Sequence, residues 1–598
     1  MRLKKKRPSN KPKKALNKGF FLIVFFIILG LLFRIIHLQS IEKNDPIFYS
    51  LPYGTDMVTY DAQAQDILKG KHPAPYYYCP LYSYFLSFIY FFFGHNLYIA
   101  RLIQMILGLF TCLFIYFIAN IVFGNCIALI SLFLSIIYDM FLIHEGVILL
   151  ESFSVFLNTA SLFFILRLEK ERKLKNIILS GLFLGLSALT RATALFFLPF
   201  ILLWMLTIAD YRIEIAELKK FAFLCLITFL TISPATIMNY IASKKFILIS
   251  TNGPVNLWIG NNEKANGRYL QPLPSHNLEK RLEEIGDRAY IEEVLRFIKE
   301  KPKKFIALLL TKFFFFWDNY EDINNMNYGQ IKGYSPLLKL PFFIGFGIIA
   351  PLAFLGICLS FRRNALLLHL FFLSYIIILI AFFVTGRHRL VVVPIMVIFS
   401  SFAISWIYDK VKEAEYKKLA FSFFPLLLGI ILGWKNDIYA NFVPIIYQDG
   451  FHIKGGEEIT IKDTSEEWRG QDCLVLNRGT KCKKEIVIEE DLLKFKEISL
   501  KFKYGTLPNT IVELKINESP SSAIDFPYTQ GLINRYTCFV DKSILKNGVN
   551  SFVFEVKEGT LAIPYDTTYT FGRSYEFRDG EFKKIKKGEF LVELSLKK

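Results

Sequence analysis

The sequence has few cysteines, and none of them forms the pattern of a metal site. Its 598 residues include eight cysteines, with no CxxC pair and no cysteine–histidine spacing typical of zinc binding. Four lie inside apolar runs, where a small apolar side chain is sufficient: Cys112, Cys126, Cys225 and Cys358. Three more lie towards the C-terminal end: Cys473, Cys482 and Cys538. A disulfide between Cys473 and Cys482 requires that this part of the chain lie outside the cytoplasm.

Acidic residues are absent from the first 18 positions, which contain nine Lys and Arg residues and contribute to a formal net charge of +19. A basic tail directly before an apolar run sets membrane topology and contacts anionic lipid. The charge therefore does not indicate a nucleic-acid partner. No small-residue cleavage site follows the apolar run, which argues against a cleaved signal peptide.

Apolar runs, in contrast, are abundant. The chain is 53% apolar, contains 61 Phe and has a mean hydropathy of +0.36, which excludes an ordinary soluble protein. Runs of about 20 apolar residues predict membrane-spanning helices. We expect eleven of them, at residues 20–38, 97–120, 122–142, 147–168, 176–191, 193–209, 220–241, 337–360, 365–385, 390–408 and 417–434.

The segment Leu81–Gly94 decides the topology. It is apolar but short and rich in Tyr, so we predict a helix at the membrane surface rather than a span. The basic loops at 170–175, 362–363 and 409–418 then share the cytoplasmic side with the N-terminal tail, as the positive-inside rule requires. A span at Leu81–Gly94 would violate that rule repeatedly.

The C-terminal residues change character. Alternation of apolar and polar residues at 497–504, 510–516, 551–556 and 590–597 predicts antiparallel strands with one buried face. About 150 residues are enough for one β-sandwich.

The expected fold class is mainly α: a polytopic membrane protein of about eleven transmembrane helices with surface helices on the outer face, plus a C-terminal all-β sandwich. The expected domains are a basic cytoplasmic tail at 1–18, a membrane domain at 19–435 with outer loops 39–96 and 243–335, and an extracytoplasmic sandwich at 446–598. We expect a multi-pass protein of the cell (inner or plasma) membrane.

Asp56 begins a short amphipathic helix on the predicted outer side. Apolar residues recur there at three- and four-residue spacing, and Gly70 fits the helix end. In one interpretation Asp56 or Thr55 merely caps the helix. In the other, Asp56 is a general base that removes a proton from an acceptor hydroxyl as a glycosidic bond forms, and Tyr60, one turn away, binds the sugar or the acceptor.

Further carboxylates lie near the same boundary. Glu151 lies in a Phe- and Val-rich segment, where an ionisable residue is expensive, so it either pairs with a neighbouring helix or serves the reaction. Helical geometry places Glu145 and Glu151 on different faces. His144 and Glu145 are either ordinary turn residues or parts of the site.

Cationic side chains on the outer side are candidates for binding a phosphate leaving group. They are Arg191, Arg387, His388, Arg389 and, in an apolar stretch, Lys312. Snorkelling to lipid headgroups is the alternative for the arginines. The outer segment 252–262 offers Asn256, Trp258 and Asn261, a composition that suits sugar binding and also a plain turn.

These motifs, in this order, resemble the polytopic GT-C glycosyltransferases of the protein mannosyltransferase group, which includes the lipid A aminoarabinose transferases. The resemblance covers roughly residues 15–435 and rests on motifs at Asp56, Tyr60, Ala64 and Gly70; Pro80-Leu81-Tyr82, Gly94 and Arg101; Glu151-Ser152-Phe153; Gly181 to Arg191; Asn252 to Gly267; Trp317 and Glu321; and Gly386, Arg387, Arg389 and Pro394.

The resemblance implies inverting transfer of a sugar from a polyprenyl-phosphate carrier to a glycan, lipid or protein acceptor, with Asp56 as the base. The family's usual acidic doublet is absent, since Met57 follows Asp56. We therefore expect no cofactor; a divalent metal is not supported. The rival function is a transporter or flippase for an amphiphile, which predicts pseudo-symmetric halves and helices interrupted at the membrane midplane, neither of which the sequence shows. A third is a non-catalytic glycan-assembly protein whose C-terminal domain is a binding module.

Overall fold

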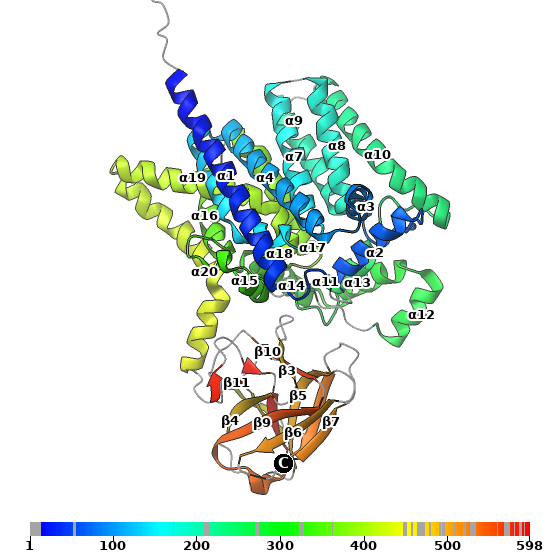
Figure 1. Ribbon diagram of the computed structural model, residues 1–598, viewed down its shortest axis with the longest axis vertical. Coiled ribbons are helices and arrows are strands. Elements are labelled where there is room, and N and C mark those ends of the chain that lie inside the picture. The colour runs from blue at the N-terminus through cyan, green and yellow to red at the C-terminus, as the bar shows by residue number, and fades with distance from the viewer. Residues whose placement is uncertain are drawn as a thin grey trace, which may run out of the picture. The chain divides into compact units, whose positions relative to one another are not determined.

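A computed structural model describes most of the chain (Figure 1). It describes residues 13–446 except 52–54, 172, 209–214, 270–273, 322–324, 326–327 and 362, and the strands within 451–597 with parts of the segments between them. Most of the predicted basic tail, residues 1–12, lies outside the described residues. The chain divides into two compact units, Met1–Gly433 and Trp434–Lys598, which are described separately below.

The first unit is built from helices. In chain order they are α1 Lys13–Asn44, α2 Asp56–Leu68, α3 Leu81–Phe93, α4 Leu97–Val122, α5 Asn125–Ile137, α6 Asp139–Glu145, α7 Glu151–Lys170, α8 Leu174–Thr190, η1 Ala192–Phe197, α9 Leu198–Ile208, α10 Ile215–Ser243, α11 Gly253–Gly260, α12 His276–Ile285, α13 Arg288–Glu300, α14 Pro302–Trp317, α15 Tyr328–Tyr334, η2 Pro336–Lys339, α16 Phe346–Leu359, η3 Arg363–Ala365, α17 Leu366–Ala381, α18 Gly386–Arg389, η4 Leu390–Val392, α19 Val393–Lys412 and α20 Tyr416–Ile446.

Six helical segments of the described chain are long and apolar enough to cross a membrane. They are Gly19–Asn44, Leu97–Val122, Glu151–Lys170, Ile215–Ser243, Gly386–Lys412 and Tyr416–Trp434. The other five predicted spans coincide with shorter apolar helices: Asn125–Ile137, Leu174–Thr190, Ala192–Thr207, Phe346–Leu359 and Leu366–Ala381. A mainly helical, multi-pass membrane protein is therefore confirmed. The 13-residue helix α3 exposes Phe88, Phe91, Phe92 and Phe93 along one side.

Two predicted spans are shorter than their apolar runs because the chain is extended at Tyr138 and Ile344. These residues form an isolated parallel bridge. The amide of Asp139 donates to the Ile344 carbonyl at 3.1 Å, and the Ile344 amide donates to the Ile137 carbonyl at 3.0 Å. Helix α5 therefore ends at Ile137, and α16 begins only at Phe346.

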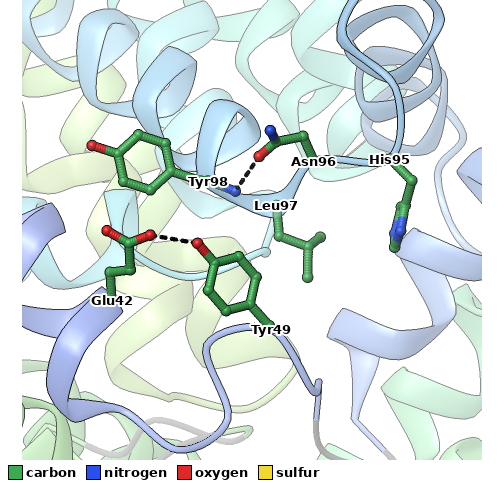
Figure 2. Close-up of a pocket in the computed structure, with 6 residues that line it drawn as sticks. All are labelled: Glu42, Tyr49, His95, Asn96, Leu97 and Tyr98. Atoms are coloured by element: carbon green, nitrogen blue, oxygen red, sulfur yellow. Dashed lines mark hydrogen bonds between the residues drawn. The ribbon is translucent and has the colours of Figure 1, made fainter.

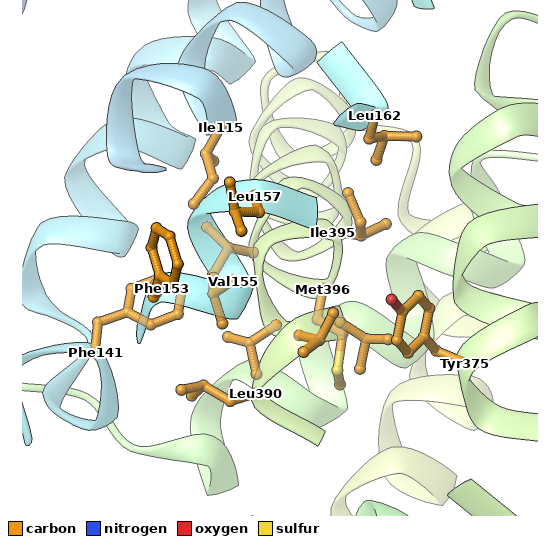
Figure 3. Packing of buried hydrophobic residues seen from close by; sticks show 14 of the residues in the cluster. Ile115, Phe141, Phe153, Val155, Leu157, Leu162, Tyr375, Leu390, Ile395 and Met396 are labelled. Carbon is orange, nitrogen blue, oxygen red and sulfur yellow. The ribbon is translucent and has the colours of Figure 1, made fainter. Parts of the chain in front are cut away.

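The core of the first unit lies around α7 (Figure 3). Apolar side chains of α7, such as Val155 and Leu157, pack with Ile115 of α4 and Met396 of α19. Helix α7 is buried on most sides, so few of its residues face a lipid environment, and its polar residues Asn158 and Thr159 hydrogen-bond to backbone carbonyls inside the protein.

Small residues let α8 approach α10 closely. A Cβ atom at Gly185 would lie 2.6 Å from the Thr231 Cβ and 2.8 Å from the Thr228 carbonyl oxygen, and Gly181 is equally constrained. The Thr228 hydroxyl donates to the Gly181 carbonyl at 3.3 Å. Gly181 and Gly185, four residues apart in the motif that runs from Gly181 to Arg191, thus serve helix packing.

The second unit holds antiparallel strands: β1 Phe451–Gly455, β2 Glu458–Lys462, β3 Cys473–Asn477, β4 Lys481–Ile488, β5 Glu497–Thr506, β6 Thr510–Ile516, β7 Ser522–Phe526, β8 Asn534–Phe539, β9 Gly548–Glu558, β10 Thr560–Asp566, β11 Ser574–Arg578, β12 Glu581–Lys584, β13 Glu589–Phe590 and β14 Val592–Lys597. One sheet runs β1-β2-β14-β5-β10-β13, with β3 on β10 and β8 on β5, and the other runs β12-β11-β4-β9-β6-β7. The predicted strands at the C-terminal end are confirmed.

Both sheets contribute to one core. Phe502 of β5 and Phe554 of β9 meet there with ring centroids 5.0 Å apart. Cys482 is buried in this core, whereas the side chain of Cys473, its predicted disulfide partner, lies outside the described residues.

Candidate active site

A cavity of about 650 Å³ lies in the first unit, where α2, η1, α11, α17 and α18 meet. Of the residues predicted from the sequence, six line it: Asp56, Tyr60, Arg191, Asn256, Arg387 and His388. These residues are spread over more than 300 positions of the chain, so only the fold brings them together.

Asp56 is the first residue of α2, and its carboxylate is held by distant residues. Arg387 Nη1 donates to Asp56 Oδ2 at 2.7 Å. Asn325 Nδ2 donates to the same oxygen at 3.1 Å, while Asn325 Oδ1 accepts from the Asp56 backbone amide at 3.0 Å. Thr55 occupies the N-cap position without a side-chain capping bond. The partners of Asp56 are therefore tertiary ones.

The charge state of Asp56 follows from these contacts. Burial disfavours the charged carboxylate, but the charge of Arg387 and the hydrogen bonds from Arg387 and Asn325 outweigh it, and the pKa of Asp56 lies below its usual value. Asp56 is consequently ionised at neutral pH, and it can accept a proton only as this support is withdrawn.

Glu151 extends the charged cluster. It begins α7, is buried, and accepts from Arg191 Nη2 at 2.6 Å. Arg387 Nε lies 3.6 Å from the same oxygen, Glu151 Oε1. Asp56, Arg387, Glu151 and Arg191 thus form a row of alternating charges, which we call the charged row. Two carboxylates and two guanidinium groups balance one another in it.

The turn that precedes Glu151 is fixed by polar side chains of α4. Gln104 Nε2 donates to the carbonyls of Glu145 and Val147 at 3.0 and 2.7 Å. Arg101 Nε donates to the Gly146 carbonyl at 2.8 Å. Buried backbone carbonyls that no helix satisfies need such donors. The result is a fixed entry into α7 and a fixed position for Glu151.

Glu145 itself points away from the cavity and pairs with the first span. Arg34 Nε lies 2.7 Å from Glu145 Oε2, and Arg34 Nη2 donates to Oε1 at 2.8 Å. A Cβ atom at Gly108 would lie only 1.9 Å from Glu145 Oε1, so the carboxylate fills a notch in α4. Glu145 lines no part of the cavity.

Arg389 also serves the structure rather than the cavity. It is buried, donates to the Phe316 carbonyl at 3.0 Å, and pairs with Glu321 Oε1 at 2.9 Å. Its guanidinium lies 3.6 Å from the centroid of the Phe346 ring. These contacts hold α18, and with it Arg387, against the outer loop.

His388 lines the cavity beside the charged row. Its Nδ1 lies 2.5 Å from the Thr385 hydroxyl, and its ring meets Phe383 edge-on at 5.3 Å. If Thr385 donates, the imidazole carries its hydrogen on Nε2.

The other predicted site residues do not line the cavity. Lys312 Nζ donates to Asn261 Oδ1 at 2.8 Å, and burial lowers the pKa of Lys312 to about 7. Trp258 packs on Tyr290 with ring centroids 5.2 Å apart. His144 is fully buried behind the row, and neither ring nitrogen has a partner among the described residues.

Sequence reasoning missed several cavity residues. Tyr77 and Tyr78 lie in the Tyr-Tyr-Tyr run after α2, and this aromatic cluster close to Asp56 was a usable signal. Tyr269 of the cavity, and Asn325, which hydrogen-bonds to Asp56, offered no local signal, because both are single residues of the long outer loop.

A second, open pocket of about 440 Å³ lies at the ends of α1 and α4 (Figure 2). It is lined by Glu42, Tyr49, His95, Asn96, Leu97 and Tyr98, and Tyr49 donates to Glu42. Its residues take no part in the charged row. Among the described residues no group of three or more His, Cys, Asp or Glu side chains is arranged to hold a metal.

Residues 71–238 match the family model described as dolichyl-phosphate-mannose-protein mannosyltransferase. The resemblance stated from the sequence is thereby confirmed for this segment, which contains Glu151 and Arg191 but neither Asp56 nor Arg387. No curated protein matches the chain in sequence.

The chain is similar to solved structures that include the following three. The oligosaccharyltransferase of Archaeoglobus fulgidus in the apo form is 15% identical, with a TM-score of 0.41 over 69% of this chain and 54% of that one. ArnT from Cupriavidus metallidurans bound to undecaprenyl phosphate is 12% identical, with a TM-score of 0.40 over 74% and 67%. Arabinosyltransferase EmbB from Mycobacterium smegmatis is 11% identical, with a TM-score of 0.27 over 94% and 65%. The chain spans about half the length of the Archaeoglobus protein.

Proposed function

We propose, from the family match of residues 71–238 and the charged row at the cavity, that the chain is a glycosyltransferase. It would move a sugar from a polyprenyl-phosphate carrier to an acceptor hydroxyl, with inversion at the anomeric carbon. The observation that carries the proposal is the pairing of Asp56 with Arg387 at 2.7 Å in the wall of a large cavity.

We place the cavity on the outer face of the membrane. This placement rests on eleven spans with α3 at the membrane surface, the N-terminus in the cytoplasm and the C-terminal β-sandwich outside. It is supported by the basic loops that the positive-inside rule assigns to the cytoplasm. The domain boundaries proposed are 1–18, 19–435 and 446–598.

The donor would bind through its phosphate and its lipid tail. Arg191 and Arg387 supply guanidinium groups suited to a phosphate, and His388 can donate a hydrogen bond beside them. The apolar lining at Leu195, Phe196, Pro199, Ile378 and Leu379 belongs to η1, α9 and α17. A polyprenyl tail matches this lining because both are apolar.

Asp56 would act as the base. The acceptor O–H bond breaks and its proton goes to the Asp56 carboxylate, while the acceptor oxygen forms a bond to the anomeric carbon. The bond from that carbon to the phosphate oxygen breaks, and polyprenyl phosphate leaves with the electron pair. Arg191 and Arg387 would stabilise the charge that grows on the phosphate.

Glu151 would hold both arginines in place and stabilise positive charge on the sugar. A donor phosphate attracts Arg387, and any shift of this arginine away from Asp56 removes the main contact that keeps the carboxylate from taking a proton. Donor binding would therefore make Asp56 a stronger base.

The test is a membrane assay with radiolabelled polyprenyl-phosphate hexoses and pentoses. Asp56→Asn should reduce sugar transfer by roughly 10²- to 10⁴-fold, the usual contribution of a positioned base. Asp66→Asn is the matched control, since Asp66 lies on the same helix, is half-exposed and forms an ion pair with the exposed Lys71.

Equal transfer by wild type and Asp56→Asn would remove Asp56 as the base. Movement of labelled lipid across the bilayer without any sugar transfer would instead support the transporter.

A further inference from the structure

The cavity has two chemically different sides, and only one of them fits a lipid. The apolar side lies along η1, α9 and α17, as described above for the donor tail. The polar and aromatic part of the lining comes from other elements: Tyr77 and Tyr78 from the segment after α2, Tyr269 from the outer loop, and Asn252 and Asn256 at the start of α11. We call these five residues the tyrosine–asparagine side.

The tyrosines gather around the proposed base. Tyr60 lies behind Tyr78 with ring centroids 5.7 Å apart, and Tyr77 meets Tyr78 edge-on at 4.9 Å. Burial raises the pKa of Tyr77, Tyr78 and Tyr269, and the charge of Asp56 raises each of them further. The pKa of Tyr78 reaches about 12, so its hydroxyl stays protonated at any physiological pH.

Hydrogen-bonding groups on this side are available. Within the described part of the chain, the hydroxyls of Tyr77 and Tyr78 have no hydrogen-bond partner. Asn252 Oδ1 accepts from the Ser250 hydroxyl at 3.2 Å, which orients its amide. Asn256 lines the cavity one helical turn further along α11. An amide offers two donors and an acceptor, and a phenol offers one of each.

On the basis of the proposed function, we infer that the acceptor is a saccharide and that it binds against the tyrosine–asparagine side. A sugar ring has apolar C–H faces, which pack on aromatic rings, and a rim of hydroxyls, which pair with amides and phenols.

Two other acceptor classes fit less well. An extended peptide binds best by pairing with an exposed strand edge, and the described residues of the first unit hold only the isolated bridge Tyr138–Ile344. A lipid hydroxyl would present its chains to the tyrosines and leave their hydroxyls and the asparagine amides without partners, which is unfavourable.

The test identifies the bond that is formed. Membranes containing the full chain receive the radiolabelled polyprenyl-phosphate sugars, and the product made on the endogenous acceptor is partially hydrolysed with acid. A labelled disaccharide is the expected fragment. Release of label from protein by alkaline β-elimination, or label in a lipid that yields no disaccharide, would overturn the inference.

Variants then test the surface. Tyr77→Ala and Tyr78→Phe should each reduce transfer at limiting acceptor by roughly tenfold, equivalent to one lost contact, while polyprenyl phosphate still binds as in wild type. Tyr49→Phe is the control, since Tyr49 belongs to the separate open pocket. Unchanged transfer in both cavity variants would contradict the inference.

The two proposals fail in different ways. If wild type never cleaves the donor, the proposed function is wrong and the inference falls with it. If the donor is cleaved in an Asp56-dependent manner but no sugar–sugar bond forms, only the inference is wrong.

Discussion

The guanidinium of Arg387 is shared between two carboxylates, at 2.7 Å from Asp56 and 3.6 Å from Glu151. A shared cation of this kind can move toward either side when a third anion arrives. At the residue scale, therefore, the site can respond to the donor phosphate through a small displacement of one side chain.

The lowered pKa of Asp56 predicts how the rate of transfer depends on pH on the acidic side. The carboxylate stays ionised down to a pH below the usual Asp value of about 3.9, so titration of Asp56 in the free enzyme should not reduce transfer between pH 8 and 5. The measurement is kcat/KM against pH, which reports the free enzyme. A loss of activity centred above pH 5 that persists in Asp61→Asn and Asp66→Asn would contradict this assignment.

The buried pair Arg34–Glu145 should be a strong and mutually dependent contribution to stability. Arg34→Met or Glu145→Gln alone leaves a buried charge without its partner, and each should reduce the free energy of unfolding by about 3–5 kcal/mol. The double variant should lose less free energy of unfolding than the two single variants lose together. Thermal unfolding in detergent measures the stability of the single and double variants, and Lys418→Met serves as the control at an exposed position.

At the element scale, the contact between α8 and α10 depends on the absence of side chains. Gly185→Ala should destabilise the protein by about 1–3 kcal/mol, because the new Cβ meets Thr231 and the Thr228 carbonyl. Gly333→Ala is the matched control, since nothing lies within 4 Å of a Cβ at that position. Equal unfolding temperatures for the two variants would contradict this prediction, because they would show that α10 can move away from the new Cβ without loss of stability.

Helix α18 is a short element held by its neighbours. Its four residues carry Arg387 into the cavity while Arg389 binds the opposite way, to Glu321 and the carbonyls at the end of α14. The two arginines are separated by one residue, yet Arg387 lines the cavity and Arg389 has a structural role. Their shared sequence motif did not reveal this difference.

At the scale of the whole molecule, the proposed topology makes opposite predictions for two fusions. A periplasmic reporter enzyme should be active at the C-terminus and inactive when fused after Lys175, in a loop assigned to the cytoplasm. Activity at Lys175, or its absence at the C-terminus, would overturn the topology and with it the outer placement of the cavity.

Much of the architecture could be predicted from the sequence, because long apolar runs and period-two alternation are local signals. Helix interruptions could not, since Tyr138 is extended only through its bridge to Ile344, some 200 residues away. For the site, Asp56 and Arg387 could be predicted because ionisable side chains at a membrane boundary are usually functional or paired. The structural role of Arg389 depends on backbone carbonyls such as that of Phe316, which carry no sequence signal. The pairing of Glu145 depends on Arg34 of α1, which only the folded structure brings close.

The notch at Gly108 links two positions that are far apart in the chain. Since any Cβ there would meet Glu145 Oε1 at 1.9 Å, a larger residue at 108 is compatible only with a shorter side chain at 145. In relatives that keep this arrangement, substitutions at these positions should occur together rather than singly. An Ala at 108 with Glu retained at 145 would mark a protein whose first span packs differently.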